Sequence, residues 1–243
     1  EMQAQLAADP AFARWVARHT VSHQQPGYAA VYVSLKEPGV PPGDASDAQL
    51  DAVADLADRY SFSEARVSHT QNLLLTDVRR DQLHALWQDL CELKLAAPNI
   101  GTVNDMICCP GLDFCSLANA GSIPIAKQIN ERFDDLDYLY DLGEVRVNMS
   151  GCMNACGHHH VAHIGILGVD KKGVEFYQLT LGGSSANDAV LGDRLGPAIG
   201  KEEVAEAISR ILGVYVDQRT EDERFIDTYR RLGAAPFKEA VYA

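Results

Sequence analysis

The chain has 243 residues, which is enough for two small domains or one large one with a buried core. Its hydrophobic content of 47% and charged content of 23% are ordinary for a globular protein, and no stretch resembles a signal peptide or approaches the ~20 apolar residues of a membrane span. A net charge of −13 excludes a nucleic-acid-binding function, because phosphate binding needs a basic face.

Residues 1–25 predict an amphipathic helix around Phe12, Trp15 and Val16, followed by a linker. Residues 27–35 are rich in β-branched and aromatic side chains and predict a strand. A helix is expected to begin at Ser46 or Asp47 as N-cap. Its apolar face is predicted to contain Leu50, Val53, Leu56 and Ala57.

Residues 66–78 predict a second strand region. A second amphipathic helix is indicated by the spacing of Leu83, Leu86, Trp87, Leu90 and Leu93. The order strand–helix–strand–helix over residues 26–99 predicts a small α/β domain.

From about residue 100 the pattern changes, and residues 100–243 are expected to form a second α/β domain. A helix is predicted from about Phe114, with a kink or restart at Pro124. Strands are predicted over residues 144–150, 164–168 and 174–181, the last two joined by a turn at residues 170–173. Further helices are predicted over residues 202–216 and around residues 225–232.

Two pairs of cysteines stand out in the second part. Cys109 and Cys115 are separated by five residues, and Cys152 and Cys156 by three. Glycines flank both pairs, and they allow the backbone to approach a bound group closely and to direct N–H groups at it. Four thiolates suit a [4Fe–4S] cluster, with one thiolate for each iron.

Two other sites are compatible with these cysteines. A structural zinc site favours about two to four residues between paired ligands, so the second pair fits zinc and the first fits poorly. A pair of disulfides is the other alternative, although six cysteines with two of them adjacent suit a reducing cytoplasm better. Cys91 is expected to be a buried free thiol, and Cys108 a packed neighbour of Cys109 rather than a ligand.

Residues 150–157, Ser-Gly-Cys-Met-Asn-Ala-Cys-Gly, together with both cysteine spacings, closely resemble the C-terminal half of the siroheme sulfite and nitrite reductases. Residues 71–75, 163–165 and 177–183 agree with this likeness, which extends from about Val21 to the end of the chain. The resemblance implies an α/β (α+β) fold, with a ferredoxin-like half-domain followed by a cluster-binding α/β domain. It favours a [4Fe–4S] cluster over zinc or disulfides.

The resemblance also implies roles for particular residues. The cluster ligands would be Cys109, Cys115, Cys152 and Cys156, and Cys156 would also bridge the cluster to the siroheme iron. Siroheme contacts are expected at Gln71 and Asn72, for which hydrogen bonding at a strand end is the alternative, and at Asn154. One or two histidines are expected to border the siroheme, with the others structural, among His158, His159, His160 and His163.

The implied reaction is the six-electron reduction of sulfite to sulfide, with nitrite reduction to ammonia as the alternative. A non-catalytic four-cysteine zinc or iron–sulfur module is the alternative of another class. No GxGxxG or P-loop motif occurs, so the electron donor is expected to be a separate ferredoxin or flavoprotein reductase.

A small anionic substrate and the siroheme carboxylates need several convergent cations, which the cysteine motifs lack. In the family these cations come mostly from the N-terminal half. The chain begins with Glu1 rather than Met, so it is expected to lie inside a longer polypeptide whose N-terminal half supplies them. The catalytic residues therefore cannot be assigned on this chain.

Overall fold

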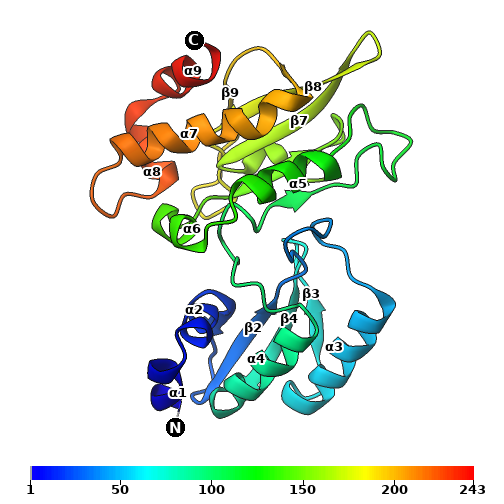
Figure 1. Cartoon of the computed structure of the whole chain (residues 1–243), viewed down its shortest axis with the longest axis vertical. Helices are drawn as coiled ribbons and strands as arrows, with labels where there is room; N and C mark the ends of the chain where they lie inside the picture. The colour runs from blue at the N-terminus through cyan, green and yellow to red at the C-terminus, as the bar shows by residue number, and fades with distance from the viewer. Residues whose placement is uncertain (1) are drawn as a thin grey trace. The chain divides into compact units, whose positions relative to one another are not determined.

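The computed structural model describes residues 2–243, which form two compact units. The first extends to Ile100 and the second comprises Gly101–Ala243. Figure 1 shows the elements of each unit, and each is described by itself below. Within residues 2–243, no helix has both the length and the apolar character needed to cross a membrane.

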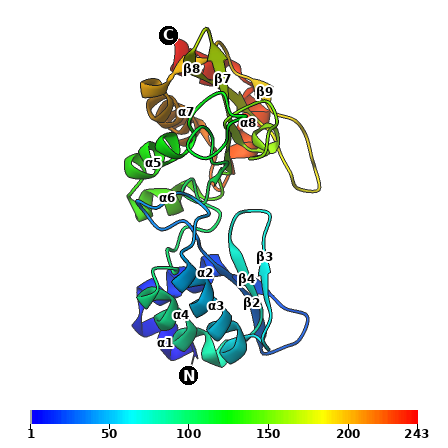
Figure 2. The ribbon, with the colours of Figure 1, turned by 90° about the vertical axis from the view of Figure 1, so that its right-hand side faces the viewer.

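The first unit is a four-stranded antiparallel sheet with helices on one of its faces (Figure 2). Its helices and strands are α1 (Met2–Ala8), α2 (Pro10–His19), β1 (Thr20–Ser22), β2 (Tyr28–Val33), α3 (Asp47–Tyr60), β3 (Ala65–Val67), β4 (Leu73–Arg79), the 3-10 helix η1 (Arg80–Gln82) and α4 (Leu83–Glu92). The strand order is β1-β2-β4-β3. The core lies between β2 and β4 on one side and α2, α3 and α4 on the other.

The start of α3 follows from its sequence. The Ser46 hydroxyl accepts a hydrogen bond from the Gln49 N–H at 3.1 Å, and the Gln49 side chain accepts one from the Ser46 N–H at 3.0 Å. This reciprocal capping box confirms the predicted N-cap. Val53, Leu56 and Ala57 are buried as predicted, but the prediction for Leu50 was wrong because its side chain is 50% exposed.

The predicted strand region 66–78 is two antiparallel strands, β3 and β4, connected through residues 68–72. The segment predicted as an N-terminal helix and linker also contributes to this unit. Phe12 and Trp15 of α2 are fully buried in its core, and β1 pairs with β2. β1 escaped prediction because a three-residue edge strand has too little alternation to detect.

The second unit is built on a mixed six-stranded sheet. Its helices and strands are β5 (Ile107–Cys108), α5 (Ile123–Arg132), α6 (Leu136–Leu142), β6 (Val147–Ser150), η2 (His159–Val161), β7 (Ile164–Lys171), β8 (Val174–Leu181), β9 (Asp193–Arg194), β10 (Ile199–Gly200), η3 (Lys201–Glu203), α7 (Val204–Gln218), α8 (Phe225–Leu232) and α9 (Ala235–Tyr242). The strand order is β10-β8-β7-β6-β5, with β9 beside β8. β5, β6 and β7 are parallel, and β7 and β8 form the predicted hairpin.

The core of this unit forms where α5 and α7 pack on the sheet (Figure 1). Ile164 and Ile166 of β7 are fully buried there, as are Ile129 of α5 and Ile208 and Ile211 of α7. Residues alternate along β7, so Gly165 and Leu167 face the opposite side of the sheet. That opposite side carries η2, because a Cβ on Gly165 would lie 2.2 Å from the His159 carbonyl oxygen.

The predicted helix from Phe114 was wrong. Residues 109–122 form an irregular loop, and α5 begins at Ile123 with Pro124 in its first turn. Phe114 and Leu117 are three positions apart, as on one face of a helix, but they are 80% and 70% exposed. α6 and α9 were not predicted from the sequence.

Candidate functional site

Both cysteine pairs follow strands that are neighbours in the sheet. β5 ends at Cys108, directly before Cys109, and β6 ends at Ser150, two residues before Cys152. The two strands are parallel, with Cys108 opposite Met149, and the Cys109 N–H donates to the Met149 carbonyl at 3.1 Å. Since parallel strands point the same way, both cysteine loops begin at the same edge of the sheet.

Backbone contacts join the two loops. The Gly151 N–H donates to the Cys109 Sγ at 3.0 Å, and the Gly151 carbonyl accepts from the N–H groups of Asn119 and Ala120 at 2.8 and 3.1 Å. The backbones of the two loops lie so close together that a Cβ on Gly151 would be 2.8 Å from the Gly111 Cα. Glycine is needed at Gly151 for this contact.

The second loop folds back on β6. A Cβ on Gly157 would lie 1.9 Å from the Met149 carbonyl oxygen. The Gly157 N–H donates to the Ser150 hydroxyl at 3.1 Å, and the Asn148 side chain donates to the Gly157 carbonyl at 3.0 Å. The backbone conformation of residues 151–157 is therefore fixed at both ends.

All six cysteines are free thiols, so the disulfide alternative does not apply. Cys152 is buried, Cys109 and Cys115 are half-buried, and Cys156 is exposed. Cys108 is buried, as predicted for a packed neighbour. Cys91 was predicted to be buried and is exposed, because α4 turns that position away from the core that holds Leu86 and Leu90.

Among residues 2–243, no three cysteine, histidine or acidic side chains converge on a point that would suit a single metal ion. An iron–sulfur cubane makes a different demand, since each thiolate binds its own iron and the four sulfurs surround the cluster. Two cysteine loops at one sheet edge, with a backbone N–H already donated to one sulfur, fit such a cluster.

The two predicted siroheme contacts of the first unit lie in the turn between β3 and β4. Asn72 is 1% exposed, and its side-chain oxygen accepts a hydrogen bond from the Leu35 N–H at 3.2 Å. Gln71 has a left-handed backbone with φ of 57°. Lys36, which was not predicted from the sequence, is buried nearby, and its Nζ donates to the Thr70 carbonyl at 2.5 Å. The siroheme contacts of Gln71 and Asn72 stay predictions.

In the second unit, Asn154 and His158 are exposed, whereas His159 and His163 are buried. Burial lowers the pKa of His159 and of His163 to about 4, so both rings are neutral at pH 7. The Nδ1 of His163 accepts the Arg146 N–H at 3.2 Å. In the described part of the chain, the buried Nδ1 of His159 has no hydrogen-bond partner.

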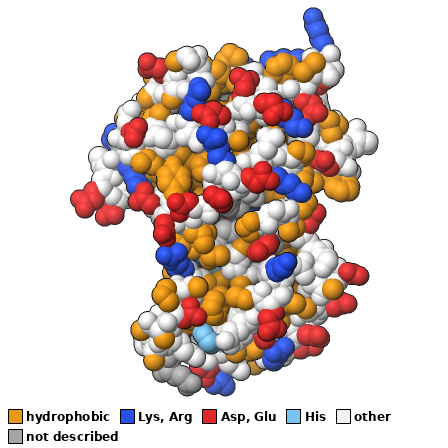
Figure 3. All heavy atoms as spheres, in the orientation of Figure 1, with side chains coloured by type: hydrophobic (Ala, Val, Ile, Leu, Met, Phe, Trp, Pro, Cys, Tyr) orange, Lys and Arg blue, Asp and Glu red, His pale blue; other side chains and the backbone are white. Residues whose placement is uncertain are grey.

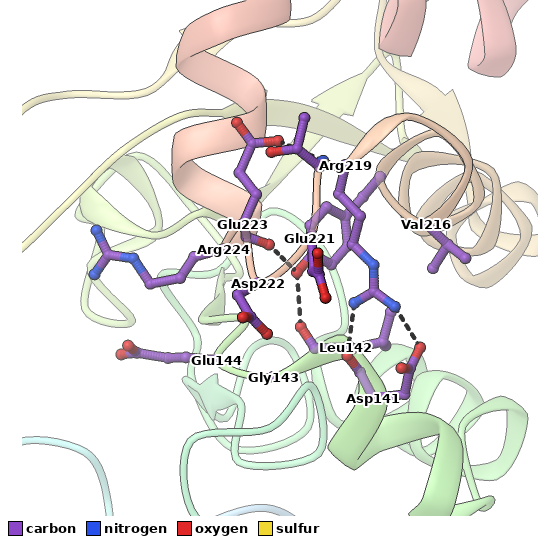
Figure 4. A pocket seen from close by; sticks show the side chains of 12 residues that line it. Asp141, Leu142, Gly143, Glu144, Val216, Arg219, Glu221, Asp222, Glu223 and Arg224 are labelled. Carbon is purple, nitrogen blue, oxygen red and sulfur yellow. Dashed lines mark hydrogen bonds and ion pairs between the residues drawn. The ribbon is translucent and has the colours of Figure 1, made fainter.

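A pocket of about 460 Å³ lies at the ends of α6 and α7 (Figure 4). Arg219 reaches across it to Asp141, donating to its carbonyl and carboxylate at 2.6 Å each. Five carboxylates line the pocket, those of Asp141, Glu144, Glu221, Asp222 and Glu223. An acidic pocket does not suit an anionic substrate or the siroheme carboxylates.

The arginines of the second unit are mostly neutralised by acidic neighbours. Seven of the eight form ion pairs, namely Arg132, Arg146, Arg210, Arg219, Arg224, Arg230 and Arg231. On the face drawn in Figure 3, basic and acidic side chains are interspersed and form no large basic patch. This unit therefore presents no convergent set of arginines for an anion.

Comparison with protein families matches both units. The model described as "Nitrite and sulphite reductase 4Fe-4S domain" matches residues 101–243, and that described as "Nitrite/Sulfite reductase ferredoxin-like half domain" matches residues 23–93. The chain belongs to the nitrite and sulfite reductase family. The α/β fold with a ferredoxin-like half-domain is confirmed, and the cofactors of this reductase family are a [4Fe–4S] cluster and siroheme.

Relatives within the reductase family include both activities. "Sulfite reductase [ferredoxin] 1" of Mycolicibacterium paratuberculosis is 29% identical over 86% of this chain, and "Ferredoxin--nitrite reductase, chloroplastic" of Zea mays is 28% identical over 86%. The chain spans only 39% and 38% of these two proteins. The solved structure of the Mycobacterium tuberculosis NirA protein has a TM-score of 0.74 and 28% identity, and the match covers 90% of this chain and 41% of NirA.

A shorter member of the reductase family is also similar. "Sulfite reductase, assimilatory-type" of Nitratidesulfovibrio vulgaris is 24% identical over 84% of this chain, and the match covers 90% of its length. The chain thus spans about two fifths of the longer relatives in this family and 90% of the shorter one.

Proposed function

We propose that the chain holds a [4Fe–4S] cluster through Cys109, Cys115, Cys152 and Cys156. The observation that carries the proposal is the joining of the two cysteine loops at one edge of the sheet, with the Gly151 N–H directed at the Cys109 sulfur. Such an N–H group stabilises the negative charge of a cluster ligand. A single zinc ion would need three or four of these side chains to converge on one point, and no such group occurs among residues 2–243.

Cys156 is our candidate for the ligand shared with the siroheme iron. Its side chain is exposed, whereas Cys152 in the same loop is buried. An exposed sulfur is accessible to a second group while it binds the cluster. We propose that three side chains contact the macrocycle. They are those of Asn154, which is exposed between these two cysteines, and of Gln71 and Asn72.

The proposed reaction is the six-electron reduction of sulfite to sulfide, with nitrite as the second candidate. The name of the Mycolicibacterium paratuberculosis relative supports sulfite, and that of the Zea mays relative supports nitrite. When bound, the coupled cofactors supply the electron transfer and the substrate-binding iron. The described residues of the chain hold the cluster, and their buried contacts keep its loops rigid.

The electron donor is proposed to be a ferredoxin, as the names of several relatives suggest. A donor with an acidic surface needs a local basic patch, because the chain carries a net charge of −13. Lys171, Arg194 and Lys238 line a pocket of about 530 Å³ beside the β7–β8 hairpin. We propose that the electron donor binds at the edge of this pocket. We also propose that the protein acts in the reducing cytoplasm.

Optical and EPR spectra of the purified protein test the proposal. Bound siroheme gives Soret and red visible bands, a cluster alone gives broad brown absorption, and a zinc protein is colourless. We expect siroheme bands, about five irons per siroheme (four in the cluster and one in the macrocycle) and magnetically coupled signals from the two centres. Zinc in place of iron would support the non-catalytic module, and two uncoupled iron signals would exclude Cys156 as a bridge.

A further inference from the structure

Ser122 occupies the N-cap position of α5 but does not cap the helix. Its backbone has φ of −114° and ψ of −44°, and its side chain makes no hydrogen bond to the first turn of α5. The side chain is completely buried, and its Oγ lies 3.7 Å from the Cys109 Sγ. A buried hydroxyl needs a partner, and the partner here is the sulfur rather than the helix.

Two glycines leave room for this hydroxyl. A Cβ on Gly111 would lie 2.6 Å from the Ser122 Oγ, and a Cβ on Gly151 would lie 3.0 Å from the same atom. Gly111 belongs to the first cysteine loop and Gly151 precedes the second cysteine pair. A side chain at either position would displace the hydroxyl from the sulfur.

The residue before Ser122 is held from both sides. The Gly121 N–H donates to the Glu175 carboxylate at 2.7 Å, and the Tyr177 hydroxyl donates to the Gly121 carbonyl at 2.9 Å. The bond from Gly121 keeps the pKa of Glu175 below its ordinary value, so the carboxylate stays charged at neutral pH. β8 thereby fixes the backbone that presents the Ser122 hydroxyl.

We propose that Ser122 donates a hydrogen bond to the Cys109 thiolate and makes the reduction potential of the cluster less negative. This inference rests on the proposed function, in which Cys109 is a cluster ligand. A ligand thiolate carries no proton, so the hydroxyl must be the donor. Reduction adds negative charge to the cluster, and a donor to its sulfur stabilises the reduced state more than the oxidised one.

The experiment is a redox titration, followed by EPR, of the protein with its cofactors bound. Ser122→Ala removes the hydrogen-bond donor to the sulfur. It removes no capping bond, because the Ser122 side chain makes no hydrogen bond to the first turn of α5. We expect Ser122→Ala to keep its iron and to shift the midpoint potential of the cluster to more negative values. The matched control is Ser116→Ala, at an exposed serine of the same loop, which should keep the wild-type potential.

An unchanged potential in Ser122→Ala with full iron content would overturn the inference while leaving the cluster assignment intact. A wild-type protein without iron would instead contradict the proposed function. If Ser122→Ala loses its iron, Ser122→Thr decides, because it keeps the hydroxyl. Retained iron and potential in Ser122→Thr support the hydrogen bond, and loss of iron in both variants overturns it.

Discussion

Gly157 lies directly against Met149, so closely that a Cβ on Gly157 would come within 1.9 Å of the Met149 carbonyl oxygen. Neither backbone segment can move away easily, because the Gly157 N–H donates to the Ser150 hydroxyl and Met149 lies in β6. We expect Gly157→Ala to lower the free energy of unfolding by about 3 kcal/mol, measured by thermal unfolding of the second unit.

The matched control for Gly157→Ala is Gly213→Ala. Gly213 lies within α7, and a Cβ there would have no atom outside its own helix within 4 Å. Alanine is the better helix former by about 1 kcal/mol, so this variant should be slightly more stable than the wild type. Equal stability of the two variants would contradict the close approach at Gly157.

The cysteines fall into two groups with different expected phenotypes. Serine in place of Cys109, Cys115, Cys152 or Cys156 should abolish the cluster, because iron prefers thiolate to hydroxyl ligands here. Cys91→Ser and Cys108→Ser should leave the iron content near the wild-type value. Iron and acid-labile sulfide analysis gives the answer, and a Cys115→Ser protein with four irons would refute the ligand set.

The free energy of unfolding should decrease at acidic pH because of His163. Burial lowers the pKa of this ring to about 4 from 6.5. The unfolded chain therefore binds the proton more tightly, so stability is fully present above pH 6.5 and is lost progressively as the pH falls to about 4. A shift of this size corresponds to about 3 kcal/mol, and the buried His159 should add to the loss.

His163→Asn tests this, because the amide oxygen can accept the Arg146 N–H and does not titrate. Its stability should fall less between pH 6.5 and pH 4.5 than that of the wild type. His69→Gln, at an exposed position, should keep the wild-type dependence. Both tryptophans, Trp15 and Trp87, lie in the first unit, so circular dichroism rather than tryptophan fluorescence should follow the unfolding. An identical acid dependence in His163→Asn would contradict the assignment.

Residues 1–243 expressed alone should not reduce sulfite or nitrite with reduced methyl viologen. Most arginines of the second unit are already in ion pairs, and the pocket beside α6 is acidic. Arg66 and Arg79 of the first unit are also paired, with Glu64 and Asp81. Sulfide or ammonia production by the isolated chain would show that the anion site lies within it.

The regular elements with strong periodicity were predicted well from sequence. α3 begins where Ser46 indicated, and the β7–β8 hairpin turns at residues 172–173, inside the predicted turn at 170–173. The failures came where distant contacts decide the structure. A helix was predicted from about Phe114, but bonds from Asn119 and Ala120 to Gly151 hold this segment in a loop.

The candidate site was only partly accessible to prediction. The cysteine spacing and the family resemblance predicted four cysteine ligands without any knowledge of the fold, but not the buried Ser122, which is separated from Cys109 by thirteen positions. Nothing in the local sequence of Ser122 distinguishes it from a helix cap. The sequence offered one indication of its role. Ser122 precedes a first helical turn that contains a proline and lies close in sequence to a predicted cluster ligand.

Two of the bonds that join the cysteine loops, from Asn119 and Ala120 to Gly151, are made between main-chain atoms, which are common to all residues. The side chains of Leu112, Phe114 and Met153 instead extend outward, with exposures of 47%, 80% and 87%. We therefore expect substitutions at these outward positions to be tolerated, whereas the insertion or deletion of one residue would misplace every bond. The loop should therefore tolerate substitution at these outward positions better than any change in its length.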